Sequence, residues 1–537
     1  MQVRRLAAWT ALPLVVTLGL VACGDGDGGS GESNPNATVS IEIAEPQYLV
    51  PTNTSETSGS QVLSALFSPL VDYDEQHMPY EVAAESVTSE DNQNWTITLK
   101  DGYTFHNGEK VTVQNYIDAW NYGAYGPNGQ NNNYFFEKIA GYADMQAAED
   151  GATPAATTLT GLKKVDDLTM TVELVEPYAD FRAMLGYTAF YPMPSAAFTS
   201  PGVLDPAYQE APIGQGPFKM SGSWQHDAKV VVEKYDEFTG QQPKVAGVEF
   251  RIYQQNSAAY ADVLSNNLDV IKTIPTENLS TASADLGERY QQSSASTIQL
   301  LAFPTYQKDF SNPDVRKAIS MAIDRDEISN AVFKGSQQSA RSFVSPVVAG
   351  YRDDTIGAAG EFNPTAAKAL YAEAGGPSKI IISYNGDGGH KDWVDATANQ
   401  LSANLGIEVV GNAEPKFADL LTKVEKQENV GLFRMGWVMD YPSMENYLGP
   451  LFSTNGSSNY YGYSNPEFDK LLAEGAAAAT EEEAIAKYQA AEDLLAEDMP
   501  AIPLRYGQNN YGHSTKVQDV HIDVFNRVDL LKIEAIS

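Results

Sequence analysis

The sequence predicts a mixed α/β fold in a chain long enough for more than one lobe. Residues 38–43, 95–100 and 169–174 alternate apolar and polar side chains, which is the period of half-buried strands. Two helices are equally plain: one begins at Asn312, a capping residue followed by proline, and the other covers the Ala-, Glu- and Leu-rich residues 481–498. A chain of 537 residues is enough for two or three lobes with cores of their own.

The first 22 residues have the layout of an export signal. Arg4 and Arg5 precede an apolar run that is too short and too interrupted to span a membrane. The run ends in Leu-Val-Ala-Cys, the pattern at which bacterial lipoproteins are acylated and cleaved, so Cys23 is expected to carry a lipid and to become the mature N-terminus. An ordinary signal peptide with an incidental cysteine is the alternative. Cys23 is the only cysteine, which excludes a disulfide within the chain.

Residues 23–36 are rich in Gly, Ser and acidic side chains, which cannot pack a core. The sequence therefore predicts a flexible tether between the lipid and the folded body. Two acyl chains bury enough methylene groups for stable anchoring, so the body is expected outside the cytoplasm, at the membrane of a bacterial cell. A G-x-G-x-x-G within the tether lacks the strand and the helix that a dinucleotide site requires.

Composition and motifs argue against several classes of function. The 70 acidic residues outnumber the 35 basic ones, and this net charge of −35 is unsuited to binding nucleic acid. It favours solubility, with attraction of cationic ligands as the alternative. No nucleophile elbow, zinc-protease or phosphate-loop motif is present, and the six histidines are scattered, so no catalytic residue, cofactor or metal is predicted. A pair of glycosidase carboxylates stays open, because its members can lie far apart in the chain.

Several blocks of sequence between about Val39 and the C-terminus carry a family resemblance. The most telling are 66–74, 95–112, 214–218, 312–325, 436–442 and 463–472. With these blocks in this order, the chain resembles the family 5 extracytoplasmic solute-binding proteins of peptide and nickel ABC importers, and most closely their oligopeptide-binding branch.

The resemblance implies a type II periplasmic-binding-protein fold, in which two hinged α/β lobes close on a ligand and an extra lobe is added. Lobe I would combine residues 37–74, 205–300 and 503–537. The extra lobe, lobe II, would cover 75–204, and lobe III would cover 301–502.

The resemblance also implies a function. The chain would be a monomeric, lipid-anchored receptor that binds oligopeptides and delivers them to the permease subunits of an ABC importer, without catalysing a reaction. Another solute of the family, such as an oligosaccharide, a nickel chelate or an opine-like compound, is the alternative within transport. A peptide-sensing signalling receptor is an alternative outside it, and a hydrolase is a remote one.

Ligand-binding residues are expected at three places. Asp440, in a Trp-x-x-Asp-Tyr motif, matches the aspartate that pairs with a peptide's α-ammonium; otherwise it caps a turn. Trp437 would line a side-chain pocket or belong to the core. Ser55 and Thr57 lie in a loop whose main chain would pair with the ligand. The tyrosine-rich segment 121–136 could lie over the cleft, or its tyrosines could serve packing.

The carboxyl end of a peptide needs a cation. Arg434 matches a position that faces the ligand carboxylate, and its planar guanidinium suits bidentate pairing; a surface arginine at a strand end is the alternative. Lys334 and His390 match positions that meet the carboxylates of ligands of other lengths. One further basic position of the branch is lost or displaced, with Glu425 and Lys426 in its place.

Overall fold

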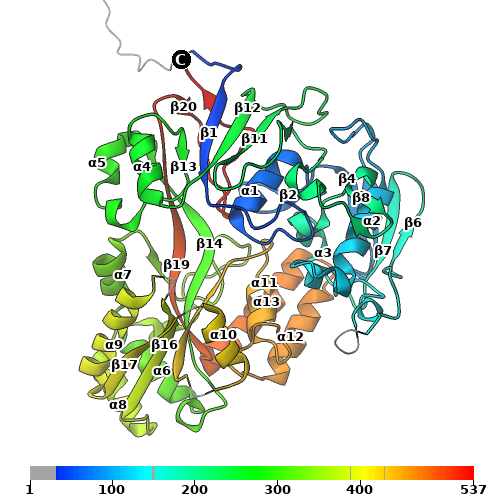
Figure 1. Ribbon diagram of the computed structural model, residues 1–537. Helices are drawn as coiled ribbons and strands as arrows, with labels where there is room; N and C mark the ends of the chain where they lie inside the picture. The colour runs from blue at the N-terminus through cyan, green and yellow to red at the C-terminus, as the bar shows by residue number, and fades with distance from the viewer. Residues whose placement is uncertain (1–31, 148–151, 387–388, 416, 429) are drawn as a thin grey trace, which may run out of the picture.

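One eleven-stranded sheet runs through most of the computed structural model of the protein (Figure 1). A four-stranded sheet and three two-stranded sheets complete the strands of the described ranges. The α/β class predicted from the sequence is confirmed. No helix in the part of the chain described by the structure has both the length and the apolar character needed to cross a membrane. The structure describes residues 32–147, 152–386, 389–415, 417–428 and 430–537.

The upper region of Figure 1 contains one half of the large sheet. Its elements are β1 (Thr38–Ile43), α1 (Thr57–Leu66), β10 (Phe218–Met220), β11 (Lys229–Lys234), β12 (Gly247–Ile252), α4 (Asn256–Leu264), β13 (Val270–Ile271), α5 (Ala282–Leu286), β20 (Val517–Gln518) and β21 (Glu534–Ala535). Strand β1 is parallel to β12, and β11 and β10 continue the sheet in antiparallel fashion. The apolar side chains of β1, α1, β11 and β12 form one buried cluster.

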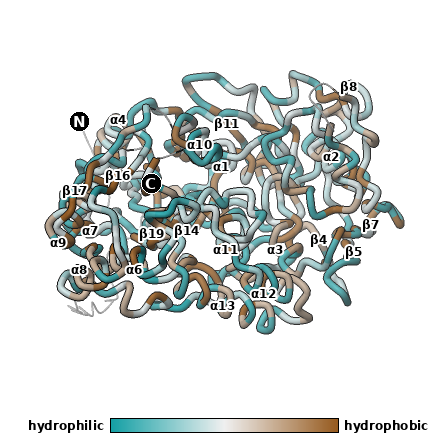
Figure 2. Tube along the Cα trace, turned by 90° about the horizontal axis from the view of Figure 1, so that it is seen from below, coloured by the Kyte–Doolittle hydropathy of each residue, from teal (hydrophilic) through white to brown (hydrophobic). Residues whose placement is uncertain are grey.

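The lower region contains the other half of the sheet. Its strands are β14 (Tyr290–Ala302), β15 (Gln338–Ser339), β16 (Lys379–Asn385), β17 (Glu408–Glu414), β18 (Leu432–Trp437) and β19 (Ala501–His513). Its helices are α6 (Pro313–Met321), α7 (Arg325–Phe333), α8 (Pro364–Glu373), α9 (Lys391–Leu405), α10 (Phe417–Glu425), α11 (Glu445–Phe452), α12 (Pro466–Ala476) and α13 (Glu481–Asp498). Seen from below, β14 and β19 lie between α7–α9 on one side and α11 on the other (Figure 2).

The side region, at the right of Figure 1, has a sheet of its own. Its elements are β2 (Val71–Tyr73), β3 (Pro79–Glu81), β4 (Ala84–Ser89), β5 (Asn94–Leu99), α2 (Val113–Ala124), β6 (Leu162–Lys164), β7 (Thr169–Glu173), α3 (Phe181–Met184), β8 (Phe198–Ser200) and β9 (Val203–Leu204). The four strands in the order β4-β5-β7-β6 are antiparallel. They share a buried core with α2, in which Trp120 is fully enclosed.

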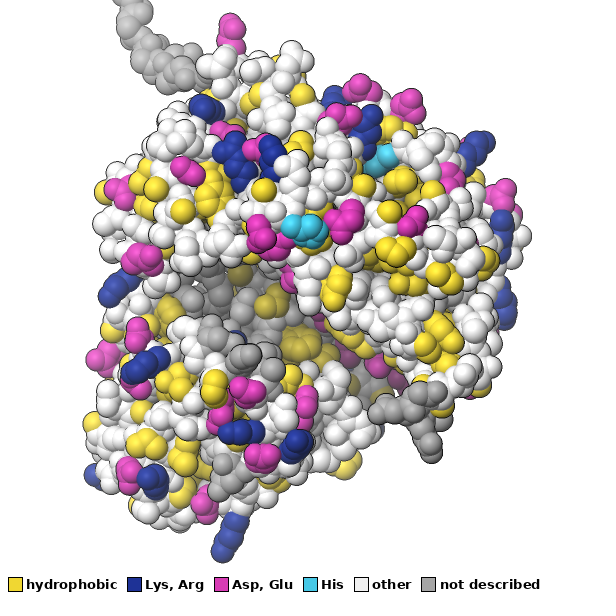
Figure 3. Space-filling model, in the orientation of Figure 1, with side chains coloured by type: hydrophobic (Ala, Val, Ile, Leu, Met, Phe, Trp, Pro, Cys, Tyr) yellow, Lys and Arg dark blue, Asp and Glu magenta, His cyan; other side chains and the backbone are white. Residues whose placement is uncertain are grey.

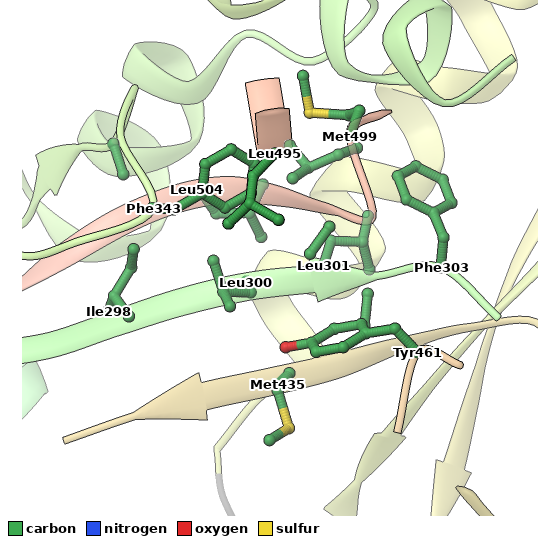
Figure 4. Packing of buried hydrophobic residues seen from close by; sticks show 14 of the residues in the cluster. Ile298, Leu300, Leu301, Phe303, Phe343, Met435, Tyr461, Leu495, Met499 and Leu504 are labelled. Atoms are coloured by element: carbon green, nitrogen blue, oxygen red, sulfur yellow. The ribbon is translucent and has the colours of Figure 1, made fainter. Parts of the chain in front are cut away.

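The largest core surrounds β14 in the lower region. Figure 4 shows the side chains of Leu300 and Leu301 on this strand among Met435 of β18, Leu504 of β19 and Leu495 of α13. All five residues are less than a tenth exposed. Full burial of one such side chain stabilises the fold by about 1.5–3 kcal/mol, so this core holds β14 firmly between its two neighbours.

The predicted elements are confirmed to within one residue. Strands β1, β5 and β7 occupy the three alternating segments. Helix α6 begins as expected, because the Asn312 Oδ1 atom accepts a hydrogen bond of 3.0 Å from the Asp314 N–H. Helix α13 covers residues 481–498 and is capped by the Thr480 side chain. The residue boundaries of the three lobes stay a prediction.

The predicted tether is too long at its carboxyl end. Cys23 and the residues up to 31 lie outside the described residues, but residues 32–34 are bonded to the C-terminal segment. The Asn34 N–H donates to the Ala535 carbonyl at 2.8 Å, and the Ser537 N–H donates to the Glu32 carbonyl at 3.0 Å. Backbone pairing of this kind needs no apolar side chains, which is why composition alone did not reveal it.

Gly214 joins the upper region to the side region. A Cβ atom on it would stand 1.9 Å from the Leu66 carbonyl oxygen, at the end of α1. Its own carbonyl accepts from the His106 N–H at 2.9 Å. The main chain at Gly214 therefore lies so close to the main chain at Leu66 that only glycine fits there.

We expect Gly214→Ala to lower the free energy of unfolding by about 2–4 kcal/mol, because the clash is with main chain that cannot rotate away. Urea unfolding followed by circular dichroism measures the change. Gly411→Ala on the exposed edge strand β17 is the matched control, since the nearest atom to its added Cβ is a Val394 methyl at 3.2 Å. Equal stability of the Gly214 variant and the parent would contradict the expectation.

Candidate functional site

The candidate site lies where β16 and β18 end. The two strands are parallel, so their carboxyl ends meet at one edge of the sheet, the edge at which open α/β sheets bind ligands. Arg434 and Trp437 lie on β18, Asp440 follows it, and His390 follows β16. The surface of the molecule is hollowed between the upper and lower regions (Figure 3).

Asp440 is a half-buried carboxylate held by an amide rather than by a cation. Its main-chain N–H donates to Asn446 Oδ1 at 2.8 Å, and Asn446 Nδ2 donates to Asp440 Oδ2 at 3.3 Å. Trp437 Nε1 donates to the same Asn446 oxygen at 3.3 Å. No Lys, Arg or His of the described residues is close enough to influence the Asp440 carboxylate. The site therefore has an oriented negative charge without a counter-charge.

The surroundings of Asp440 are rich in tyrosine. Burial raises the pKa of Asp440 to about 6; the Asn446 hydrogen bond opposes this rise and the charge of Glu445 adds to it. Burial also raises the pKa values of four tyrosines, and the charge of Asp440 raises each of them further. These are Tyr73, Tyr134, Tyr187 and Tyr447. Three of the four belong to the side region, so Asp440 faces that region across the site.

Tyr134 presents an open aromatic face near Asp440. It is 48% exposed and belongs to a stack with Phe135 and Tyr187, whose successive ring centroids are 4.5 and 4.2 Å apart. The segment is anchored to the loop before α1, because Asn132 Nδ2 donates to the Thr54 carbonyl at 2.9 Å. Aromatic faces attract cations, which suits a position opposite a carboxylate.

Ser55 and Thr57 lie beside this anchor. Both side chains are exposed, and Thr57 is the first residue of α1. Glu56 between them caps the helix, accepting from Ser58 N–H at 2.7 Å and from Gly59 N–H at 2.8 Å. The main chain of Ser55 has no hydrogen bond to another described residue, so it is available to a ligand.

Four basic side chains of the lower region are candidates for the carboxyl end of a ligand. Arg434 is half-buried on β18. His390 is the N-cap residue of α9, and its ring accepts a hydrogen bond of 3.2 Å from Trp393 Nε1. Lys334 is exposed at the end of α7, and its Nζ donates to the Ala331 carbonyl at 2.9 Å. The fourth is Arg505 on β19, only 6% exposed, which the sequence did not single out. A lone arginine within the apolar run Ala-Ile-Pro-Leu-Arg-Tyr was the available signal.

The side and lower regions are joined next to the site. Tyr178 Oη donates to Glu445 Oε2 at 2.5 Å, and Tyr441 Oη donates to the same oxygen at 3.0 Å. Tyr488 Oη donates to Asp180 Oδ2 at 2.8 Å, and burial raises the pKa of Asp180 to about 7, with the charge of Glu445 adding to the rise. These polar contacts close the site behind Asp440. No group of three His, Cys, Asp or Glu side chains suited to a metal occurs among the described residues.

Comparison with known proteins identifies the family of the chain. Residues 79–459 match the model of the bacterial extracellular solute-binding proteins, family 5 (middle). The chain belongs to this family. Among its relatives is the oligopeptide-binding protein OppA of Bacillus subtilis, 27% identical over 92% of this chain and 93% of that protein. Another is the periplasmic murein peptide-binding protein MppA of Escherichia coli, 28% identical over 86% of each.

Solved structures of the family share the fold. The unliganded open form of MppA superposes with a TM-score of 0.80 at 23% identity, covering 95% of this chain and 99% of that one. Haemophilus influenzae OppA in complex with the peptide RPPGFSPFR gives 0.74 at 22% identity, covering 94% and 100%. The predicted periplasmic-binding-protein fold is thereby confirmed for this solute-binding protein.

Proposed function

We propose that this solute-binding protein captures oligopeptides outside the cytoplasm and delivers them to the permease of an ABC importer. The observation that carries the proposal is Asp440, a half-buried carboxylate that no described cation neutralises. The names of its relatives OppA and MppA support the same ligand class.

The α-ammonium of the peptide is the missing counter-charge. An unpaired charge out of water is costly, and a bound cation removes that cost. Asn446 keeps the carboxylate aimed, Trp437 keeps Asn446 in place, and the ring of Tyr134 covers the ammonium from the opposite side. Trp437 in this role positions the binding group and borders the pocket of the first ligand side chain.

The peptide backbone and carboxylate meet other groups. The unbonded main chain of Ser55, with Thr57 at the start of α1, offers backbone hydrogen bonds that do not depend on the ligand's side chains. Arg434, His390 and Lys334 provide cationic or hydrogen-bonding partners at three positions of the lower region, so that ligands of different lengths find a partner for their carboxylate.

Delivery requires that the regions move. Strands β14 and β19 connect the upper and lower regions, and closure about them would enclose the peptide. The proposed lipid on Cys23 keeps the receptor near its permease, which raises the local concentration for delivery. The protein acts as a monomer in this scheme.

Native mass spectrometry of the purified protein tests the ligand class directly. We expect co-purified masses that disappear on mild denaturation and that sequence as peptides by tandem fragmentation. A bound sugar or a nickel chelate in their place would overturn the proposal and favour another solute of the family. Loss of peptide uptake on deletion of the gene separates import from signalling.

We expect Asp440→Asn to weaken the binding of tri-alanine by at least about 100-fold, because the ligand ammonium loses its only counter-charge. N-acetyl-tri-alanine is expected to bind the parent equally poorly. Calorimetry measures both. Asp498→Asn, at the end of α13, is the control for the loss of one carboxylate elsewhere in the lower region. Equal affinities of free and acetylated peptide for the parent would show that Asp440 does not bind an ammonium.

The affinity is expected to rise with pH between about 5 and 7 and to level off above. In the free protein the pKa of Asp440 is about 6, and a bound ammonium lowers it, so the complex holds fewer protons than the free protein. Calorimetry in two buffers of different ionisation enthalpy detects the released proton. The Asp440→Asn variant keeps Glu445, and its affinity is expected not to change with pH in this range. The same pH dependence in the variant and the parent would mean that a group other than Asp440 titrates.

A further inference from the structure

Arg505 is a buried cation whose charge nothing in the described structure balances. No described acid influences its guanidinium, and its Nε atom has no hydrogen-bond partner among the described residues. The guanidinium carbon lies 4.4 Å from the ring centroid of Phe333 and 4.8 Å from that of Trp393. The rings fix the position of the guanidinium and offset part of its desolvation cost, but they do not neutralise it.

The sheet places Arg505 and Arg434 on the two strands that flank β14. Gln299 on β14 is paired with Gly436 on one side and with Arg505 on the other. Cross-strand partners and residues two apart on a strand point to the same face, so Arg434, Gln299 and Arg505 share one face. Burial, and after it the charge of Arg434, lower the pKa of Arg505 to about 9, as expected for two cations on the same face of the sheet. The Gln299 Oε1 atom is also buried and has no hydrogen-bond partner in the described part of the chain.

We propose that Arg505 binds the carboxylate of the ligand together with Arg434. This inference rests on the proposed peptide-binding function and adds a residue to it. A carboxylate has two oxygens with about four acceptor sites, so it can accept from two guanidinium groups at once. It removes the repulsion between the two arginines and supplies the partner that Arg505 lacks.

The neighbouring helix favours the same ligand. Trp393, one of the two rings on Arg505, lies in the first turn of the 15-residue helix α9, whose N-cap residue is His390. The amino end of a helix carries a partial positive charge. An anion between Arg434 and Arg505 therefore has three sources of positive potential near it, whereas a ligand without a negative charge would leave Arg505 unbalanced by any described group.

The test compares a peptide with its own amide. Tri-, tetra- and penta-alanine and their C-terminal amides are titrated into the parent, Arg505→Gln and Arg505→Lys by calorimetry. We expect the parent to prefer at least one acid over its amide by tenfold or more. Arg505→Gln is expected to reduce that preference by about ten- to a hundredfold. Arg505→Lys is expected to reduce it less, because lysine keeps the positive charge but cannot form the bidentate hydrogen bonds of a guanidinium.

A purely structural role predicts a different result. If Arg505 only stacks between the two rings, Arg505→Gln weakens acid and amide alike, the preference is unchanged, and the inference is overturned. Arg316→Gln is the matched control, because Arg316 is also buried in the lower region but donates to the Met499 and Phe310 carbonyls. It is expected to lower the melting temperature without changing the preference.

Two further outcomes separate this inference from the proposed function. Binding of acids and amides with equal affinity to the parent would overturn the role of Arg505 and leave peptide binding intact. Failure of all six peptides to bind the parent would count against both.

Discussion

The pairing of β14 with β19 is the constraint on which the rest of the structure depends. These two 13-residue strands are antiparallel neighbours along most of their length and join residues about 200 positions apart in the chain. Strand β13 extends the sheet from β19 in the upper region, and β18 extends it from β14 in the lower region. Closing so long a loop costs entropy, which the burial of the lower core around β14 offsets.

The pairing is interrupted between the two regions. Ser294 is opposite Gln508 and Ile298 is opposite Tyr506, so three residues of β14 face only Gly507. A Cβ atom on Gly507 would stand 2.9 Å from the Thr297 Cβ atom, so the bulge requires glycine opposite it. Bulges bend a sheet and increase its twist. The interruption therefore lets the upper and lower regions meet at an angle while the strands stay continuous.

Local patterns were enough to predict much of the fold. Strand alternation and helix caps depend on residues within a few positions of each other, and β1, β5, β7, α6 and α13 lie where those patterns placed them. The pairing of residues 32–34 with the C-terminus was missed because main-chain hydrogen bonds between the two ends of the described chain leave no trace in composition.

The residues of the candidate site differ in the same way: some could be found from a local sequence motif, and others only from the pairing of distant strands. Asp440, Trp437 and Arg434 lie in one short block of sequence on and just after β18, so a local motif was enough to find them. Arg505 lies far along the chain, and only the pairing of β19 with β14 brings it to the face that Arg434 shares. The Asn446 amide that orients Asp440 became apparent only from its contacts, since an asparagine in a helix has many possible partners.

Asp440 and Arg505 are charges of opposite sign that no described residue of opposite charge compensates, and each is held in place by its neighbours. Asp440 is held by Asn446, and Arg505 is held between Phe333 and Trp393. The cost of the free carboxylate and of the free guanidinium lowers the stability of the unliganded protein, as uncompensated buried charges do. A ligand with an ammonium at one end and a carboxylate at the other would remove both costs at once. A neutral ligand would remove neither, so in the proposed function the same residues that weaken the empty fold would discriminate between ligands.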